Sequence, residues 1–574
     1  MSNFLINTGK KYDDLYNKSV NSPESFWDEL ASQNFIWNKK WSKVVDWDFK
    51  KANVSWFKDA KLNITINCID RHVKNTPEKT AIIFEPNDPN EKNKSFTYSE
   101  LLKEVCKIAN VLKSMGVKKG DRVCIYLPMI PELAFSVLAC ARIGAIHSVV
   151  FAGFSSQALA TRIDDCKSSL IITSDGSYRG EKILNLKAIV DDALDICKTQ
   201  QKVLIVNRTN ETVNLVEKRD YLLRDLITNV DDSCEPEIMD SEDPLFILYT
   251  SGSTGKPKGM VHTCGGYMVY TSYTFKNIFQ YDENDIYWCT ADIGWITGHS
   301  YILYGPLSNC ATTIMYEGVP SYPDYSRFWQ IVDKYKVNQF YTAPTAIRAL
   351  AKQGTGFLKN SNLASLKVLG TVGEPINDEA WQWYNSNIGK GNCPIVDTWW
   401  QTETGGILIS SIPKVIPEKP TFATKPFVGV QPVLLDDNGV ELHKPNVVGK
   451  LCVKYPWPSI ARTIWGNHQR YIDTYFSAFK NMYFTGDGAF KDEEGNFRIT
   501  GRVDDVIIVS GHNLGTAPIE DAVNEHDNVA ESAIVGFPHD IKGNALYGFV
   551  TLKSKSLNID QIKAEINSLI SEKI

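Results

Sequence analysis

The segment Ile247-Leu248-Tyr249-Thr250-Ser251-Gly252-Ser253-Thr254-Gly255-Lys256-Pro257-Lys258-Gly259 decides the fold. Its apolar beginning is typical of a buried strand, and the loop that follows contains Ser, Thr and Gly with two lysines at its edge. Such a loop directs successive backbone N–H groups and hydroxyls into one concavity, which suits a polyphosphate. The loop is not a Walker A motif, because the spacing of its glycines is too short and Pro257 follows Lys256 where Ser or Thr is required.

Helical and strand patterns alternate on both sides of this segment. Residues 98–115 are amphipathic, 121–127 read as a buried strand, 131–143 as a helix and 145–151 as another strand. Further strands are predicted at residues 170–173, 202–206, 246–250 and 368–371. This rhythm predicts a mostly parallel α/β sheet.

The sequence also indicates two β-hairpins, a small C-terminal domain and an N-terminal extension. The Asp- and Gly-containing turns 436–439 and 492–495 are each expected to join a β-hairpin. A small domain is expected from residue 504 onward, with strands at 506–510, 531–536 and 546–552 and helices at 519–525 and 560–571. Residues 1–61 are rich in Trp and Phe without a clean period, so we expect an extension whose aromatic side chains pack on the main body.

Length and composition limit the class of protein. A chain of 574 residues is longer than one core normally supports, so at least two domains are expected. The net charge of −6 argues against nonspecific binding to nucleic acid or to an anionic membrane. The longest apolar region, 133–154, is interrupted by Arg142, Gly144 and His147, which favours a buried helix and strand over a membrane span. The 12 cysteines are scattered, and no signal peptide begins the chain, so a cytoplasmic protein with reduced thiols is expected.

Three further segments carry residues suited to nucleotide chemistry. Gly373-Glu374-Pro375 is a turn whose glycine permits a close backbone approach. Asp397-Thr398-Trp399-Trp400-Gln401-Thr402-Glu403-Thr404-Gly405 offers hydroxyls and a carboxylate, the hard oxygen ligand that Mg²⁺ prefers. Tyr483-Phe484-Thr485-Gly486-Asp487-Gly488, followed by Gly501-Arg502, offers a carboxylate able to accept two ribose hydroxyls.

Together these segments resemble the signatures of adenylate-forming enzymes, the acyl-CoA synthetase and luciferase superfamily, and most of all the acetyl-CoA synthetase family. The resemblance extends almost from end to end. It implies an α/β fold with a large N-terminal domain of sheet layers plus a β-rich subdomain, and a small mobile α+β C-terminal domain. The implied domains are an N-terminal cap at 1–61, an AMP-binding adenylation domain at 62–503 and the mobile domain at 504–574, with Asp504 as the hinge.

Residue roles follow from the resemblance alone. It assigns catalysis to Thr250, Lys256, Thr402 and Glu403, with Thr402 at the α-phosphate of ATP and Glu403 on Mg²⁺. The other nucleotide-binding positions that it implies are Ser251, Gly252, Ser253, Thr254, Gly255, Gly373, Glu374, Pro375, Asp397, Thr398, Trp399, Trp400, Gln401, Asp487, Arg502 and Asn513. Asn524, His526 and Val529 fall where the family binds a further cation, although a surface histidine is the alternative interpretation of His526.

The resemblance also implies two substrate sites. Ile296, Thr297, Val372 and Trp400 match the walls of an acid pocket, and the indole at 400 fills the space that a longer acyl chain needs. Acetate is therefore expected, with propionate as a poorer substrate. The positions implied for coenzyme A are Arg179, Gly180, Glu181, Lys182, Thr297, Ser321 and Ser510, with residues 151–154 nearby. Surface salt bridges are the alternative role of Arg179 and Lys182.

Two departures from the family pattern stand out. Asn513 occupies a position where the family has an arginine that contacts the nucleotide, so one charge-assisted hydrogen bond is lost. The sequence also stops at Ile574, before the family's segment of the type Pro-Lys-Thr-x-Ser-Gly-Lys, and Lys573 does not match that lysine. We therefore expect the sequence to be a C-terminally truncated fragment.

The expected activity is that of an AMP-forming acetate–CoA ligase that uses ATP, Mg²⁺ and coenzyme A, with small-molecule substrates and neither nucleic acid nor membrane as a partner. Control by lysine acetyltransferases and deacetylases is expected only if the full-length C-terminus exists. Alternatives are a propionyl- or other short-acyl-CoA synthetase, and a catalytically impaired adenylate-binding protein. A carrier-protein-loading adenylation domain fits less well, because the N-terminal aromatic segment and the Arg179 segment suit free coenzyme A.

Overall fold

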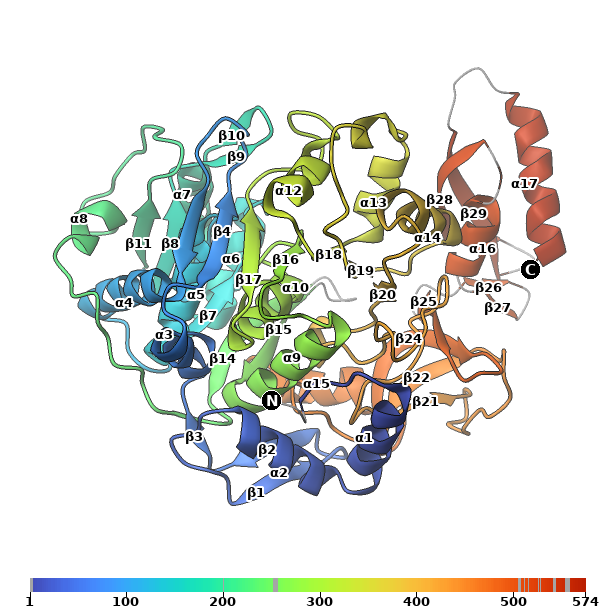
Figure 1. Cartoon of the computed structure of the whole chain (residues 1–574), viewed down its shortest axis with the longest axis horizontal. Helices are drawn as coiled ribbons and strands as arrows, with labels where there is room; N and C mark the ends of the chain where they lie inside the picture. Colours follow the sequence, from blue (N-terminus) through green and yellow to red (C-terminus); the bar gives the residue numbers. More distant parts are fainter. Residues whose placement is uncertain are drawn as a thin grey trace.

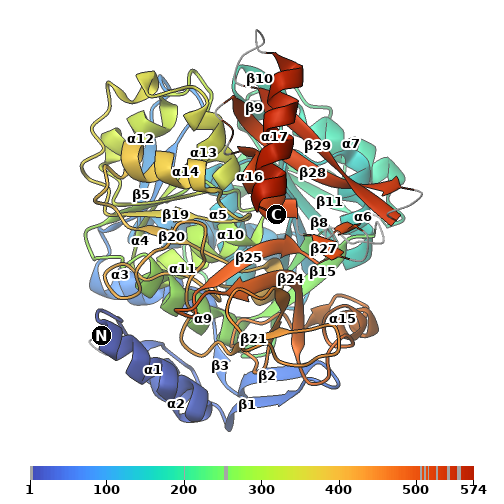
Figure 2. The ribbon, with the colours of Figure 1, turned by 90° about the vertical axis from the view of Figure 1, so that its right-hand side faces the viewer.

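The structure is a computed structural model that describes residues 4–199, 201–250, 256–503, 507–509, 512–514, 516–524, 526, 528–539, 543–552 and 558–573. Two large sheets, a smaller antiparallel sheet, an N-terminal segment and a C-terminal unit make up this part of the chain (Figure 1). The C-terminal unit lies at one end of the molecule, against the smaller sheet and the segment that carries α14 (Asp378–Trp383) (Figures 1 and 2).

The first large sheet has eight strands in the order β12-β11-β8-β6-β7-β14-β15-β23. Their bounds are β6 Arg122–Tyr126, β7 Ile146–Val149, β8 Leu170–Ser174, β11 Lys202–Val206, β12 Asp220–Leu222, β14 Pro244–Thr250, β15 Lys258–Thr263 and β23 Thr463–Ile464. The strands from β12 to β14 run parallel, and β15 and β23 are antiparallel additions.

Both faces of this sheet are buried, which explains its continuous apolar runs. In β6, Val123 and Ile125 join the main core, which includes residues of α4 (Tyr98–Ser114) and α5 (Pro131–Arg142). Cys124 and Tyr126 point to the other face, where α6 (Ser156–Cys166) and α7 (Leu186–Ile196) pack. The predicted strands and helices of this region are confirmed, including the buried helix and strand within 133–154.

The second large sheet has seven strands in the order β20-β19-β18-β16-β17-β4-β5, and only β5 is antiparallel. Their bounds are β4 Thr80–Glu85, β5 Lys94–Thr97, β16 Ile286–Cys289, β17 Thr312–Tyr316, β18 Gln339–Thr342, β19 Val368–Thr371 and β20 Ile395–Asp397. One face packs against α12 (Arg327–Tyr335), α13 (Pro344–Ala351) and α14. The other face belongs to the main core, which also contains most of α9 (Cys264–Ile278).

The smaller sheet has the order β21-β22-β24-β25, with bounds Pro432–Leu435, Gly449–Val453, Tyr483–Lys491 and Phe497–Arg502. The predicted hairpin at 492–495 is confirmed, since it joins β24 to β25. The turn at 436–439 closes a short antiparallel contact, in which Leu435 and Glu441 form a bridge and Leu442 N donates to Leu434 O at 2.8 Å. The strand that pairs with β21 along its length is β22.

The N-terminal segment consists of α1 (Gly9–Asn21), α2 (Pro23–Asn34) and the hairpin of β1 (Lys43–Asp48) and β2 (Asn53–Lys58). Phe26 and Trp27 are buried, and the Trp27 ring lies 5.9 Å from that of Tyr270 in α9. The aromatic extension therefore packs on the main body, as predicted. The smaller elements are β3 Lys61–Leu62, α3 Arg71–Asn75, β9 Ser177–Arg179, β10 Lys182–Leu184, α8 Leu223–Ile227, β13 Met239–Asp240, α10 Ile296–Gly298, α11 Gly305–Ser308 and α15 His468–Tyr475.

The C-terminal unit has a sheet of order β27-β26-β29-β28, with bounds His512–Leu514, Ile507–Val509, Gly543–Leu552 and Val529–His539. Helices α16 (Thr516–Asn524) and α17 (Ile559–Lys573) share a small core with β28. The predicted strands and helices are present, and β27 is an element that the sequence pattern did not indicate.

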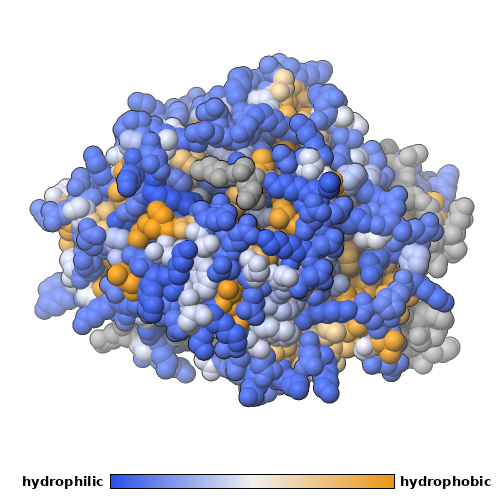
Figure 3. All heavy atoms as spheres, turned by 60° about the horizontal axis from the view of Figure 1, so that its bottom comes forward, coloured by the Kyte–Doolittle hydropathy of each residue, from blue (hydrophilic) through white to orange (hydrophobic). Residues whose placement is uncertain are grey.

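All 12 cysteines are free thiols, in agreement with the expectation of reduced cysteines. None of the helices in the described part of the chain has the length and apolar character needed to cross a membrane. The face of the molecule in Figure 3 is mostly hydrophilic, with hydrophobic side chains in small areas between the polar ones.

Candidate functional site

Segments that are distant in sequence line one cavity of about 420 Å³. The loop after β19 supplies Gly373, and the end of β20 supplies Asp397, because the carboxyl ends of neighbouring parallel strands share one edge of a sheet. Strands β24 and β25 supply Asp487 and Arg502 from the smaller sheet. The predicted residues that line the cavity are Gly373, Glu374, Pro375, Asp397, Thr398, Trp399, Trp400, Gln401, Asp487 and Arg502. Sequence reasoning missed Thr421, Ala423, Ile499 and Glu520 of the same lining, and Glu520 comes from the C-terminal unit.

The Asp487 carboxylate is fixed at the wall of this cavity. Its Oδ2 accepts hydrogen bonds from Trp399 Nε1 at 3.1 Å and from Gln401 Nε2 at 2.8 Å. Arg502 Nη1 lies 3.7 Å from Oδ1. Burial raises the pKa of Asp487 to about 6, against the opposing effect of Arg502. The carboxylate is thus oriented, with Oδ1 facing the guanidinium side.

A short 3-10 turn, Thr402–Thr404, carries the two central predicted side chains. All three of its carbonyl oxygens face donors from elsewhere. His262 Nε2 lies 2.8 Å from Thr402 O, Ala461 N donates to Glu403 O at 2.8 Å, and Trp457 Nε1 donates to Thr404 O at 2.8 Å. The turn ends at Gly405, whose φ of 69° is the left-handed conformation that favours glycine. The backbone under Thr402 and Glu403 is therefore held from three directions.

His262 is completely buried, and burial lowers its pKa to about 3. A neutral imidazole donates only one hydrogen bond. Its Nδ1 lies 3.1 Å from Ser459 O, so the shorter Nε2 contact identifies Thr402 O as the acceptor of the ring proton. Sequence reasoning missed this residue.

Glu403 is paired with two side chains that sequence reasoning also left aside. The hydroxyl of Tyr475, from α15, donates a hydrogen bond to Glu403 Oε1. Lys258 Nζ donates to the Tyr475 hydroxyl at 2.7 Å and lies 3.7 Å from Glu403 Oε1. Lys258 belongs to the sequence segment 247–259 that suggested a phosphate site. In the structure it pairs with Thr250 across β14 and β15, which places it beside the end of β14.

Lys256, the lysine assigned to catalysis by resemblance, lies elsewhere. Its side chain is 66% exposed and forms an ion pair with Asp165 at 3.1 Å. Its neighbour along the chain, the predicted loop 251–255, lies outside the described residues. Thr250 ends β14, and its Oγ1 is buried without a hydrogen-bond partner among the described atoms.

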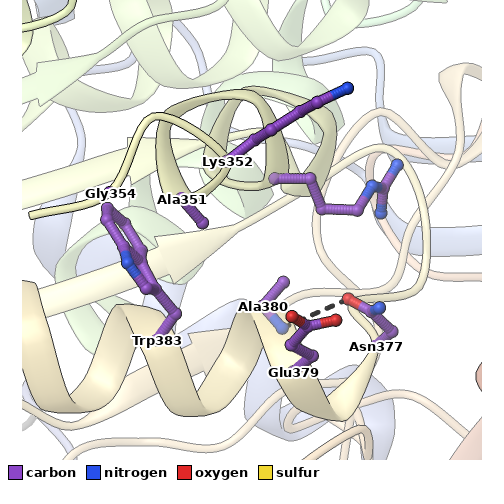
Figure 4. A pocket seen from close by; sticks show the side chains of 8 residues that line it. Ala351, Lys352, Gly354, Asn377, Glu379, Ala380 and Trp383 are labelled. Carbon is purple, nitrogen blue, oxygen red and sulfur yellow. Dashed lines mark hydrogen bonds between the residues drawn. The ribbon is translucent and has the colours of Figure 1, made fainter. Parts of the chain in front are cut away.

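Glu374 is anchored at the mouth of the cavity by α13. Thr345 N donates to Glu374 Oε1 at 2.6 Å, and Arg348 Nη2 donates to Oε2 at 3.0 Å. Behind Arg348 is a second cavity of about 290 Å³ between α13 and α14, lined also by Lys352, Glu379 and Trp383 (Figure 4). None of the sequence-predicted site residues lines this second cavity.

Of the residues predicted for an acid pocket, Ile296, Thr297 and Val372 are buried, and Trp400 is partly buried and lines the first cavity. Ile296 and Val372 belong to the main core, against which Trp400 packs. The Trp400 ring stands edge-on to that of Tyr301 at 5.0 Å, and its Nε1 donates to the Tyr341 hydroxyl at 3.3 Å. Thr297 is buried in the short helix α10. The indole is therefore held in one orientation.

The residues predicted to bind coenzyme A form a hairpin. Arg179 ends β9 and Lys182 begins β10, and the two are paired across the turn. Gly180 has a φ of 63°, and Tyr322, next to Ser321, lies beside it. Phe151 and Phe154 contact the half-exposed ring of Trp295. Ser510 and Asp504 lie outside the described residues, and of Asn513 only the backbone, in β27, is described.

The three residues predicted for a further cation lie where α16 gives way to β28. Val529 N donates to His526 O at 2.8 Å. The His526 ring is engaged on both sides, because Nε2 contacts Glu565 at 2.7 Å and Nδ1 accepts from Asn528 N. Asn524 Oδ1 is buried without a partner among the described atoms. Both ring nitrogens of His526 are thus engaged, whereas the cation site implied by the resemblance uses largely backbone oxygens and stays a prediction.

Comparison with known proteins places this chain among related sequences. The family described as AMP-binding enzyme matches residues 69–465, and its C-terminal domain matches 518–574. The family described as acetyl-coenzyme A synthetase N-terminus matches residues 12–68. An acetyl-coenzyme A synthetase from Leptospira biflexa is 57% identical over 574 residues, which cover 98% of this chain and 87% of the relative.

The chain belongs to the acetyl-coenzyme A synthetase family of AMP-binding enzymes.

Other members of this family are similarly close. An acetyl-coenzyme A synthetase from Magnetococcus marinus is 52% identical, with 100% of this chain and 88% of the relative covered. Acetyl-coenzyme A synthetase 2 from Pseudomonas putida is also 52% identical, with 99% and 88% covered. Membership confirms the adenylate-forming fold expected from the sequence. The match at residues 12–68 also confirms the resemblance of the N-terminal region to that of acetyl-CoA synthetases.

Proposed function

We propose that this protein is an AMP-forming acetate–CoA ligase, which converts ATP, acetate and coenzyme A into acetyl-CoA, AMP and pyrophosphate through an acetyl-adenylate. The observation that carries the proposal is the single cavity lined by the loops after β19 and β20 together with Asp487 and Arg502. The family supports the use of ATP and coenzyme A.

The first half-reaction joins acetate to AMP. A carboxylate oxygen of acetate attacks the α-phosphorus of ATP, and the bond to pyrophosphate breaks. Thr402 is proposed to contact the α-phosphate, since the rigid turn holds its side chain at a fixed position. Asp487 is proposed to accept the ribose hydroxyls, for which its carboxylate is already oriented by Trp399 and Gln401.

Glu403 is the proposed protein ligand of Mg²⁺. Its buried carboxylate is held by Tyr475 and Lys258, and the described residues contain no group of three metal-ligating side chains. A single carboxylate fits this ion, because Mg²⁺ usually takes most of its other ligands from water and substrate phosphates. When bound, the ion would neutralise phosphate charge. Lys258 supplies a cation on the protein side of the same carboxylate.

The second half-reaction forms the thioester. The thiolate of coenzyme A attacks the carbonyl carbon of acetyl-adenylate, and the bond from that carbon to the AMP oxygen breaks. We propose the division 1–61, 62–503 and 504–574, with the last domain rotating about Asp504 between the half-reactions. Arg179 and Lys182 are proposed to bind coenzyme A phosphates. A cytoplasmic setting and the absence of a macromolecular partner are part of the same proposal.

Trp400 carries the proposed preference for acetate. Its indole is fixed between Tyr301 and Tyr341, so it closes the space that a longer chain needs. Rigid walls exclude larger acids strongly, whereas one missing methylene costs only about 1–3 kcal/mol of transition-state binding.

Synthetic acetyl-adenylate and coenzyme A test the proposal with the purified chain. Equal amounts of acetyl-CoA and AMP, formed well above the uncatalysed rate, are expected. Tight binding of acetyl-adenylate without product would instead favour the adenylate-binding alternative. Faster turnover of propionyl-adenylate would favour the short-acyl alternative.

A further inference from the structure

The β9–β10 hairpin is contacted by residues that follow the carboxyl ends of strands from both large sheets. Asn87 follows β4, Glu317 follows β17 and Arg208 follows β11. In Figure 1 the hairpin stands at the top of the molecule, above β4 and β17. The hairpin carries Arg179 and Lys182 at paired positions beside its turn.

The Asn87 side chain forms two hydrogen bonds with Gly180 at the tip of the hairpin. Its Nδ2 donates to Gly180 O at 2.9 Å, and Gly180 N donates to its Oδ1 at 3.1 Å. The amide therefore pairs with both backbone groups of Gly180, the first of the two residues that turn the chain between Arg179 and Lys182. Asn87 itself is buried.

Asn87 is in turn fixed by a charged network. Its backbone N–H donates to Glu317 Oε2 at 3.1 Å. Arg208 binds Glu317 through two hydrogen bonds of 2.7 and 2.6 Å, and Glu91 through two more of 3.0 and 2.7 Å. Such paired, charge-assisted contacts fix geometry as well as adding energy. The Arg208 guanidinium also lies 4.8 Å from the centre of the Tyr178 ring, the residue before Arg179.

Arg208 forms ion pairs with Glu91 and Glu317, whereas the charged side chains at the hairpin tip have no ion-pair partner among the described residues. Arg208 faces two carboxylates, one of them fully buried, so its charge is neutralised in place. Arg179 and Lys182 are exposed, and neither forms an ion pair with any described residue. At this hairpin, Arg179 and Lys182 are thus cations open to an anionic ligand, and Asn87 bonds to the turn between them.

We propose that Asn87 is a positioning residue for coenzyme A, which holds Arg179 and Lys182 in register for its phosphates, with Glu317, Arg208 and Glu91 bracing it. This inference rests on the proposed function. It assigns to these four residues an effect on coenzyme A affinity and none on the binding of acetyl-adenylate.

Steady-state kinetics of thioester formation from acetyl-adenylate distinguish an effect on coenzyme A affinity from an effect on the binding of acetyl-adenylate. Asn87→Ala is expected to raise the KM for coenzyme A about tenfold, which corresponds to about 1.4 kcal/mol, because the two hydrogen bonds that order the hairpin turn are lost. The KM for acetyl-adenylate and the kcat at saturating coenzyme A are expected to stay at the wild-type values. Asn90→Ala is the matched control, because Asn90 is an exposed amide of the same loop that bonds only to Asp88.

A double-mutant cycle makes the assignment sharper. If Asn87 acts through Arg179 and Lys182, then Asn87→Ala should have little further effect on the KM for coenzyme A in a background that carries both Arg179→Ala and Lys182→Ala. An undiminished effect of Asn87→Ala in that background would overturn the proposal, as would a KM for coenzyme A in Asn87→Ala equal to that of Asn90→Ala.

A second variant covers the case in which Asn87→Ala does not fold. Glu91 is partly exposed, so Glu91→Gln should weaken its ion pair with Arg208 without preventing folding. It is expected to raise the KM for coenzyme A about twofold to threefold, and an unchanged value would overturn the proposal. Failure of the proposed function would differ from all of these results, because the wild-type chain would then form no acetyl-CoA from acetyl-adenylate.

Discussion

The ammonium of Lys258 lies 3.7 Å from the carboxylate of Glu403, with both side chains largely withdrawn from solvent. Tyr475 bridges them through its hydroxyl. Burial lowers the pKa of Lys258, and the neighbouring Glu403 opposes that effect. The pair joins the start of β15 to the turn that carries Thr402.

Lys258 is expected to matter more for adenylation than Lys256. Lys258→Ala removes a buried cation beside Glu403 and should lower kcat for acetyl-adenylate formation by about 100-fold, the size typical of losing one preorganised electrostatic group. Lys256→Ala is the control, because that side chain is mostly exposed. Comparable losses in both variants, measured by pyrophosphate release, would contradict this assignment.

His262 is expected to support catalysis without touching substrate. His262→Ala removes the side-chain donor of the Thr402 carbonyl, which keeps a 3.3 Å hydrogen bond from Gly405 N, and this loss should lower the free energy of unfolding by about 0.5–1.5 kcal/mol. The loosened turn should also lower kcat at least about tenfold. Denaturant titration and kinetics check both effects, with the exposed His443 as control in His443→Ala. A stability loss with unchanged kcat would show that the turn does not need this contact.

Asp487 should make ATP use depend on pH. Only the carboxylate can accept both ribose hydroxyls, so kcat/KM for ATP should rise with pH and reach half its plateau near the pKa of about 6. Asp487→Asn should lower kcat/KM and remove this step from the profile. A wild-type profile that is flat between pH 5 and about 7 would contradict the role.

The same carboxyl should affect stability in the opposite direction. Its native pKa of about 6 lies above the unfolded value of about 3.9, so the folded protein binds more protons between these limits. The stabilising contribution is therefore complete below about pH 4 and is lost as the pH rises through about 6. Comparing the unfolding free energy of the wild type and Asp487→Asn at both ends of this range measures the term.

Trp400 should set the length of the acid. Trp400→Gly removes the indole between Tyr301 and Tyr341 and should increase kcat/KM for butyrate while lowering that for acetate. The gain should reach at least about tenfold, because rejection of larger acids by a rigid wall is strong. Trp383→Gly, at the separate cavity of Figure 4, is the control indole. Unchanged acid preference in Trp400→Gly would mean that the indole only packs the core.

Much of the fold was predictable because its strands carry local signals. Residues 202–206 and 368–371 are mostly apolar segments that the structure contains as β11 and β19, since both faces of each sheet are buried. The hairpin at 492–495 followed from its turn residues. The 436–439 turn gave the same signal and closes a shorter antiparallel contact, while the longer pairing of β21 is with β22, which the turn residues do not indicate.

The supporting side chains of the site could not be predicted in the same way. Tyr475 is 72 residues from Glu403 in sequence, and His262 is 140 residues from Thr402. Neither belongs to a local pattern that marks a ligand site, and only the packing of α15 and β15 against the turn brings them there. The hold of Asn87 on Gly180 likewise depends on β4 ending beside the β9–β10 hairpin.

Transfer of ¹⁸O from acetate to AMP tests the central claim most directly. The chain would be incubated with acetate labelled at both carboxylate oxygens, ATP, Mg²⁺ and coenzyme A, and the phosphate group of AMP examined by mass spectrometry. Attack of acetate on the α-phosphorus predicts one ¹⁸O in each AMP formed and one left in acetyl-CoA. Label in phosphate or pyrophosphate, or AMP without label, would contradict an acetyl-adenylate intermediate.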